Sequence, residues 1–72
     1  MFIPYKNINN DSNVSSYEIG SDYISVQFTN GSIYVYSYRK AGKYHVVRMK
    51  ALAVSGDGLN SYIMRNCSKL YD

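Results

Sequence analysis

The stretch YISVQFTNGSIYVYSY, Tyr23 to Tyr38, decides the fold because it has the pattern of two strands joined by a tight turn. Asn30 and Gly31 form the dipeptide preferred in a two-residue type I′ turn, since both central residues of that turn need φ > 0. With these two residues as the loop, apolar side chains of both strands share one face. We expect this face to be the core; it carries Ile24, Val26, Phe28, Ile33 and Val35.

The opposite face of the hairpin is rich in tyrosine. The same register places Tyr23 opposite Tyr38, Ser25 opposite Tyr36 and Gln27 opposite Tyr34. Tyrosine rings with polar hydroxyl tips suit either an exposed binding surface or a second packed face. What covers these rings therefore decides whether they are core or binding site.

The segment before the hairpin predicts one more strand. Residues 1–13 read as an N-terminal arm or loop, because residues 6–13 are short polar turn-formers with a single isoleucine. Residues 14–19 are rich in valine, tyrosine and isoleucine and end at a Gly-Ser-Asp turn, which predicts a strand. Together with the hairpin it forms a three-stranded antiparallel meander.

After the hairpin, the segment from Lys43 to Val54 loses the alternation and gains helix-forming residues, which predicts a helix. One apolar stripe consists of Val46, Met49, Leu52 and Ala53, and a second consists of Tyr44, Val47 and Ala51. Two stripes indicate a helix that contacts two surfaces. A strand over residues 44–47 is the competing prediction, because these residues also suit a sheet.

A short turn separates this helix from a second one. Gly56 is expected to end the first helix in the αL conformation, and Asp57 to cap the next, which runs from about Gly58 to Leu70. Its amphipathic stripe consists of Leu59, Tyr62, Ile63, Cys67, Leu70 and Tyr71. We therefore predict an α+β fold, a three-stranded antiparallel β-meander followed by two α-helices packed on one face.

The composition indicates a single globular domain, with 72 residues of which 46% are hydrophobic and 18% charged. The one cysteine, Cys67, cannot form an internal disulfide, and the N-terminal residues show neither the basic nor the apolar region of a signal peptide. A cytoplasmic localisation is therefore expected. No apolar run approaches the roughly 18 residues of a membrane span, so no membrane partner is expected.

The net charge of +3 is unevenly distributed along the chain. Residues 1–36 carry one lysine against three acidic residues, whereas residues 37–72 carry seven lysines and arginines against two acidic residues. Such asymmetry favours an acidic partner such as a nucleic acid. Charges of this size also serve solubility alone in many small domains.

A set of short motifs carries a family resemblance. They are Val14-Ser15-Ser16, ISVQF at 24–28, Gly31, Tyr34-Val35-Tyr36, Ala53 and SGDGLNSYI at 55–63. Over residues 14–71 the chain resembles the KTSC domain, found at the C-terminus of some lysyl-tRNA synthetases and as small bacterial and phage proteins. It departs from the family after Tyr36, where many members have Val-Pro. The resemblance implies a single KTSC-like domain over residues 14–72 and suggests RNA binding, although the family has no established biochemical activity.

Tyrosines and cations together make a nucleic-acid site the first functional hypothesis, because exposed rings stack on bases and cations hold phosphates. The candidate nucleic-acid-binding residues are Tyr34, Tyr36, Tyr38, Arg39, Lys40, Lys43, Arg65 and Lys69. Arg48 and Lys50 join the basic residues in one patch if the two helices pack antiparallel. The structural alternatives are a tyrosine face packed beneath a helix and cations on solvated helix faces.

The chemistry-bearing residues do not predict an enzyme. His45 and Cys67, the one imidazole and the one thiol, cannot complete a zinc site or an oriented nucleophile pair. We expect a surface histidine and a buried inert thiol. SGDG before the second helix resembles a phosphate nest, but the charge of Asp57 favours a capped turn instead. No catalytic residue, metal or cofactor is therefore expected.

Two functions of different classes follow. The first is a non-enzymatic module that binds RNA or single-stranded nucleic acid. The alternative is a protein-interaction or homo-oligomerisation module with no nucleic-acid role, in which the tyrosine face or an edge strand at residues 14–19 pairs with a second copy or another protein.

Overall fold

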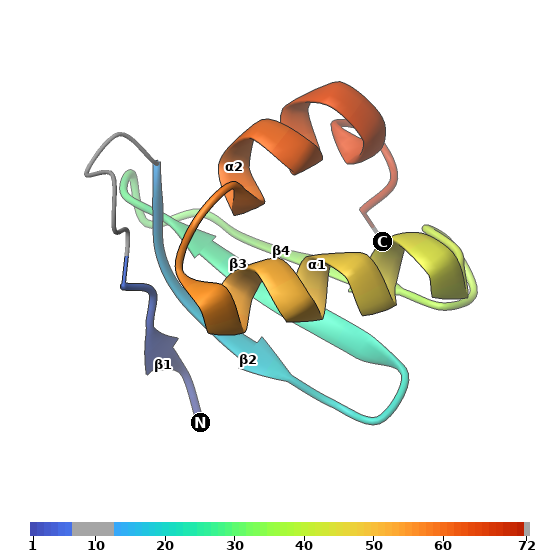
Figure 1. Ribbon diagram of the computed structural model, residues 1–72, viewed down its shortest axis with the longest axis horizontal. Helices are drawn as coiled ribbons and strands as arrows, with labels where there is room; N and C mark the ends of the chain where they lie inside the picture. Colours follow the sequence, from blue (N-terminus) through green and yellow to red (C-terminus); the bar gives the residue numbers. More distant parts are fainter. Residues whose placement is uncertain (7–12, 72) are drawn as a thin grey trace.

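The computed structural model describes residues 1–6 and 13–71. A four-stranded antiparallel sheet of order β1-β2-β3-β4 carries its helices over one face (Figure 1). The strands are β1 (Ile3–Pro4), β2 (Val14–Ile19), β3 (Tyr23–Phe28) and β4 (Ile33–Ser37). The helices are α1 (Lys43–Ser55) and α2 (Leu59–Tyr62), which continues as the π-helix η1 (Ile63–Cys67). The α+β class is confirmed, with one strand more than predicted.

The additional strand, β1, lies in the segment that we expected to be an N-terminal arm. It pairs with Ser16 and Tyr17 of β2, and the N–H of Tyr5 donates to the carbonyl oxygen of Ser15 at 3.0 Å. Residues 7–12 of the predicted loop lie outside the described residues. Because β1 and β3 flank β2, the prediction that β2 is an edge strand is wrong. Among the described strands, the edges are β1 and β4.

The hairpin between β3 and β4 turns through three residues, not two. The N–H of Phe28 donates to Ser32 O at 2.8 Å, and the N–H of Gly31 donates to Phe28 O at 2.9 Å. Asn30 Oδ1 accepts the N–H of Ser32 at 2.9 Å, and Gly31 has φ 91°. These features define a type I turn closed by a glycine bulge. An Asn-Gly pair suits this arrangement as well as it suits a type I′ turn. The predicted register is therefore wrong by one residue.

The longer loop reverses the faces of β4, because a shift of one residue moves every side chain to the opposite face. Ile24 and Val26 of β3 pair with Tyr36 and Tyr34 of β4, so both tyrosines face the helices. Ile33 turns to the open face of the sheet, where it is 52% exposed. Of the predicted core residues on this hairpin, the structure buries Ile24 and Val26, half-buries Phe28 and Val35, and exposes Ile33.

The core lies between the sheet and the helices, which cover one face of the sheet in Figure 1. The first predicted stripe of α1 is confirmed, because Val46, Met49 and Ala53 are all buried. The stripe of the second helix is confirmed at Leu59, Ile63 and Cys67, also buried. No helix within residues 1–6 and 13–71 has the length and apolar character needed to cross a membrane.

The turn between α1 and α2 differs from the prediction at one residue. Gly56 ends α1 in the αL conformation with φ 80°, as expected, and its N–H donates to Leu52 O at 3.0 Å. The N-cap position of α2 belongs to Gly58, one residue after the expected Asp57. The hydroxyl of Tyr5 accepts the N–H of Leu59, the first residue of α2, at 3.2 Å.

The N-terminal segment therefore packs against the turn between the helices. A Cβ atom on Gly56 would lie 2.6 Å from the Cβ of Lys6, closer than two such atoms approach in proteins. Gly56 thus meets two requirements, a positive φ and close contact with the segment after β1. Tyr5, 6% exposed, belongs to the core.

Tyr36 is the largest of the fully buried side chains, and its exposed fraction is 2%. Burial, and to a smaller degree the neighbouring Cys67, Tyr34 and Tyr71, raises the pKa of the Tyr36 phenol to about 12. The protonated phenol is therefore part of the folded state.

The observed register predicts that Tyr36 contributes far more to stability than Ile33. Tyr36→Ala removes a buried ring and is expected to lower the free energy of unfolding by about 3–5 kcal/mol. Ile33→Ala removes a half-exposed side chain and should cost less than about 1 kcal/mol. Urea unfolding followed by circular dichroism measures both. The reverse ranking would contradict the three-residue turn.

The raised pKa of Tyr36 predicts a loss of stability in alkaline solution. An unfolded tyrosine has a pKa of about 10, so the folded state binds the proton more tightly. The contribution of this pKa difference to the free energy of unfolding is complete below pH 10. It is lost as the pH rises toward 12, by up to about 2–3 kcal/mol. Urea midpoints at pH 9 and 11 should differ less in Tyr36→Phe than in the wild type. Tyr44→Phe, which removes an exposed phenol, is the matched control; equal pH dependence in both variants would contradict the assignment.

Candidate functional site

The tyrosines expected to stack on bases do not form an open surface. Tyr36 is buried beneath the helices. Tyr34 is half-buried, with its ring centroid 5.6 Å from that of Phe28 and 4.7 Å from that of Tyr71. Of the two alternatives for the tyrosine face, the structure favours the packed one at these two positions, because the observed register buries Tyr36 in the core and packs Tyr34 against it.

Tyr38, the third of these tyrosines, is also half-buried and lies beside two cations. Lys50 Nζ is 5.2 Å from its ring centroid and Lys43 Nζ is 6.0 Å from it. Lys50 Nζ also donates to the carbonyl oxygen of Gly20 at 2.8 Å and to that of Ser21 at 3.3 Å. Lys50 therefore joins α1 to the turn between β2 and β3.

The other predicted cations are exposed at three places. Arg39 and Lys40 lie in the turn between β4 and α1, Lys43 begins α1, and Arg65 and Lys69 lie on and just after η1. Their exposure agrees with both readings of the basic residues, a phosphate-binding patch and a solvated surface. The side chains that lie beside each cation decide whether it belongs to a phosphate-binding patch or to a solvated surface.

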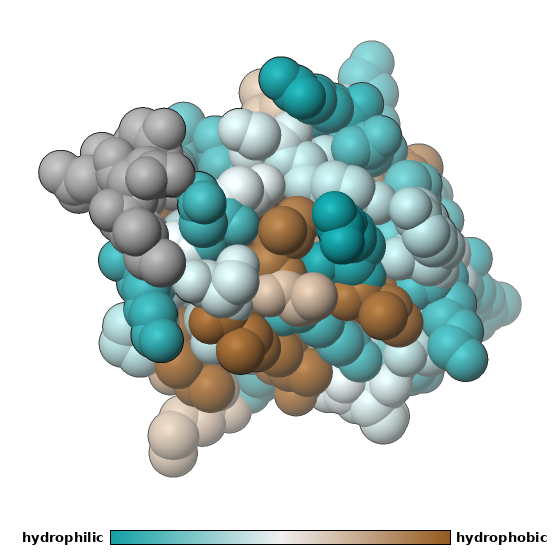
Figure 2. Space-filling view, in the orientation of Figure 1, coloured by the Kyte–Doolittle hydropathy of each residue, from teal (hydrophilic) through white to brown (hydrophobic). Residues whose placement is uncertain are grey.

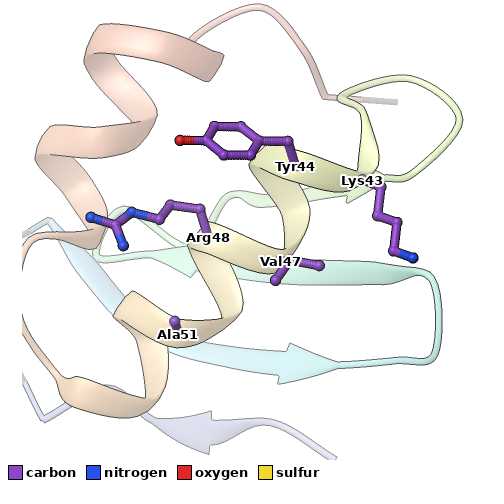
Figure 3. A pocket seen from close by; sticks show the side chains of 5 residues that line it. All are labelled: Lys43, Tyr44, Val47, Arg48 and Ala51. Atoms are coloured by element: carbon purple, nitrogen blue, oxygen red, sulfur yellow. The ribbon is translucent and has the colours of Figure 1, made fainter.

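The outer face of α1 carries an open apolar depression of about 470 Å³ between two cations. Tyr44, Val47 and Ala51 supply its apolar lining, and Lys43 and Arg48 flank it (Figure 3). Figure 2 shows apolar side chains gathered over α1 among hydrophilic ones. Tyr44 is 75% exposed. These residues form the second apolar stripe of the predicted helix, and all three are exposed and lie outside the buried core.

A second depression separates α1 from the helix that follows, and the two arginines meet there. Arg48 of α1 and Arg65 of η1 line it together with Tyr62, Ser61 and Asn66. Arg48 therefore borders both depressions and connects them into one surface. We call this surface the α1 cationic face and define it by Lys43, Tyr44, Arg48, Tyr62 and Arg65.

A polar contact between the two helices holds Tyr62 in place on this surface. His45 Nδ1 and the hydroxyl oxygen of Tyr62 are 2.7 Å apart, which joins α1 to α2. Burial raises the pKa of the Tyr62 phenol, with smaller contributions from Cys67 and Tyr44, whereas the charge of Arg48 acts in the opposite direction. The expected surface histidine is thus half-buried and hydrogen-bonded.

Cys67 is fully buried, as predicted, and burial raises the pKa of its thiol. A thiol in this environment keeps its proton at neutral pH and is a poor nucleophile. Within residues 1–6 and 13–71, no three side chains of histidine, cysteine, aspartate or glutamate gather closely enough to hold a metal ion.

The structure brings together part of the predicted basic set and adds residues that the prediction left out of the site. Arg48 and Arg65 converge on one depression, whereas Lys50 binds backbone carbonyls elsewhere. Tyr44 was not among the predicted stacking residues. The signal that identifies it is its place in the second apolar stripe, since an apolar stripe beyond the one needed for the core indicates a surface available to a partner.

No protein family, curated protein or solved structure was found to match this chain. Membership of the KTSC family therefore stays a prediction from the motifs quoted above.

Proposed function

We propose that this protein is a non-enzymatic module that binds RNA or other single-stranded nucleic acid through the α1 cationic face. The observation that carries the proposal is the 75% exposed ring of Tyr44, held on a helix between the cations Lys43 and Arg48. An aromatic ring of this kind offers a stacking surface for any base, and the flanking cations lie where the adjoining phosphates would run.

The charges of this face support an anionic partner. Within residues 1–6 and 13–71, the ion pair found joins the Met1 ammonium group to Glu18, far along the chain from α1. Lys43, Arg48 and Arg65 thus form no ion pair with a carboxylate of the described chain. Uncompensated cations on one surface raise the local concentration of anions and the rate at which a polyanion associates.

The shape of the face favours a single strand over a duplex. The depressions are open and shallow, and Tyr44 projects from a convex helix, so the ring reaches only a base that has left its own stack. Stacking of one base on one ring contributes about 1–3 kcal/mol, and phosphate contacts make up the rest of the affinity in a salt-dependent way.

Arg39 and Lys40 precede α1 directly and extend the same positive region along the chain. The proposal therefore keeps most of the cations expected from the sequence and replaces the hairpin tyrosines by Tyr44 as the stacking ring. The alternative function, protein interaction, concerns the edge of the sheet at β4 and not the ring of Tyr44.

The test is fluorescence anisotropy of a labelled 12-nucleotide single-stranded RNA at low and moderate salt. We expect Tyr44→Ala to weaken binding about 5- to 100-fold through the lost stacking. Arg48→Ala and Arg65→Ala should each weaken binding and reduce the slope of log affinity against log salt by about 0.7, the value for one phosphate contact on a single strand.

Two substitutions outside this face serve as controls. Lys69→Ala removes the same charge as Arg65→Ala but lies outside both depressions, and Val54→Ala truncates an exposed apolar residue elsewhere on α1. Both should bind RNA almost as the wild type does. Equal effects of Arg65→Ala and Lys69→Ala would show that only net charge matters, and RNA binding unchanged in Tyr44→Ala would contradict the proposed stacking.

A further inference from the structure

The edge of the sheet at β4 has backbone groups available for another strand. In antiparallel pairs, residues bonded to the neighbouring strand alternate with residues whose N–H and C=O point away from it. The N–H of Phe28 donates to Ser32 O beside one end of β4, and the N–H of Tyr38 donates to Asp22 O beside the other. These two hydrogen bonds fix which residues of β4 bond to β3. By the same alternation, the N–H and C=O groups of Ile33 and Val35 point to the side of β4 that no described strand covers.

The edge lacks the features by which proteins protect exposed strands. The residues of β4, IYVYS, include neither a proline nor a charged side chain, and β4 contains no bulge in its pairing with β3. Lysine, proline and bulges are the usual means of preventing another chain from pairing with an edge. This edge is therefore open to strand addition.

An apolar groove borders this edge on the helix side. It has a volume of about 270 Å³ and lies between the hairpin and η1. Phe28 and Tyr34 line it from the sheet, and Met64 and Tyr71 line it from the helix and the segment after it. Met64 is 65% exposed and Tyr71 is 40% exposed, so the groove opens to solvent. A strand added to β4 would direct every second side chain toward it.

Exposed cations lie close in sequence to the residues that line the groove. Arg65 and Lys69 are exposed on and after η1, and Arg39 and Lys40 follow β4 directly. A second copy of this chain would bring the same positive charge to the same place, because residues 37–72 carry seven basic and two acidic residues. Charge complementarity therefore favours an acidic partner over self-association.

From these observations we infer that β4 is a docking edge for an extended acidic peptide of another protein. The peptide adds a fifth strand to the sheet by bonding to the backbone of Ile33 and Val35. Its apolar side chains, at alternate positions, enter the groove at Tyr34 and Met64, and its acidic side chains face the surrounding cations. Backbone bonds supply affinity and the groove supplies selectivity, as in other cases of strand addition. This surface shares Arg65 with the α1 cationic face, and Arg39 and Lys40 with the positive region that extends it, but not the ring of Tyr44, which lies outside the groove.

The experiment uses three fluorescein-labelled eight-residue peptides as probes. In the first, valine alternates with glutamate; in the second, lysine replaces glutamate; the third has the composition of the first with its valines and glutamates in separate blocks. We expect the alternating acidic peptide to bind at least tenfold more tightly than either of the others. In ¹⁵N-labelled protein, its largest chemical-shift changes should fall at Ile33, Val35 and Met64.

Two substitutions test the docking edge itself. Val35→Pro removes an N–H that points away from β3, so it spares the sheet while it blocks the added strand, and should reduce peptide affinity at least tenfold. Met64→Glu, at an exposed position, should do the same by placing a negative charge on the groove, whether or not Val35→Pro folds. Tyr44→Ala should leave peptide binding unchanged, which separates this inference from the proposed RNA site.

Three results would overturn the inference. The first is shift changes that fall outside β4 and η1 for every peptide. The second is unchanged affinity in Met64→Glu. The third is a dimer in light scattering that Val35→Pro converts to a monomer, because a second copy would then occupy the edge.

Discussion

The three-residue turn at Thr29–Gly31 is the constraint on which the rest of the molecule depends. Gly31 takes the positive φ that closes the bulge, and the side chain of Asn30 accepts a hydrogen bond from the N–H of Ser32. This geometry decides which side of β4 faces the helices, and so it places Tyr36 at the centre of the core. A domain this small has few large side chains for its core, so the choice of face governs both its stability and the surface left for partners.

The helices and their buried faces could be predicted from the sequence, because several independent signals agree there. The period of the apolar residues, the loss of β-branched alternation and the glycine after the last turn all indicate α1, and it begins at Lys43 as expected. The register of the hairpin could not be predicted in this way. An Asn-Gly pair suits two turn types, and both faces of β4 carry residues that can be buried, so neither the turn nor the pattern selects one register.

The proposed binding surface could be predicted only in part, for reasons that lie in the tertiary structure. The excess of cations after residue 36 is visible in the sequence, but which of them converge depends on the packing of η1 against α1. Lys50 shows the difficulty, since it carries the same charge as its neighbours yet binds the carbonyl of Gly20. The strand β1 escaped prediction because a two-residue strand that includes Pro4 has no recognisable pattern of its own.

The contact between Tyr5 and Leu59 has a consequence for how the chain acquires its structure. The two residues are 54 positions apart, and beside them Gly56 lies against the side chain of Lys6. Closing so long a loop costs much conformational entropy and is repaid only when β2, α1 and α2 are already assembled. We therefore expect the hairpin and α1, which are local in sequence, to form first and the first strand to dock last. The hydroxyl of Tyr5, directly after the first strand, then ties the beginning of α2 to the edge of the sheet.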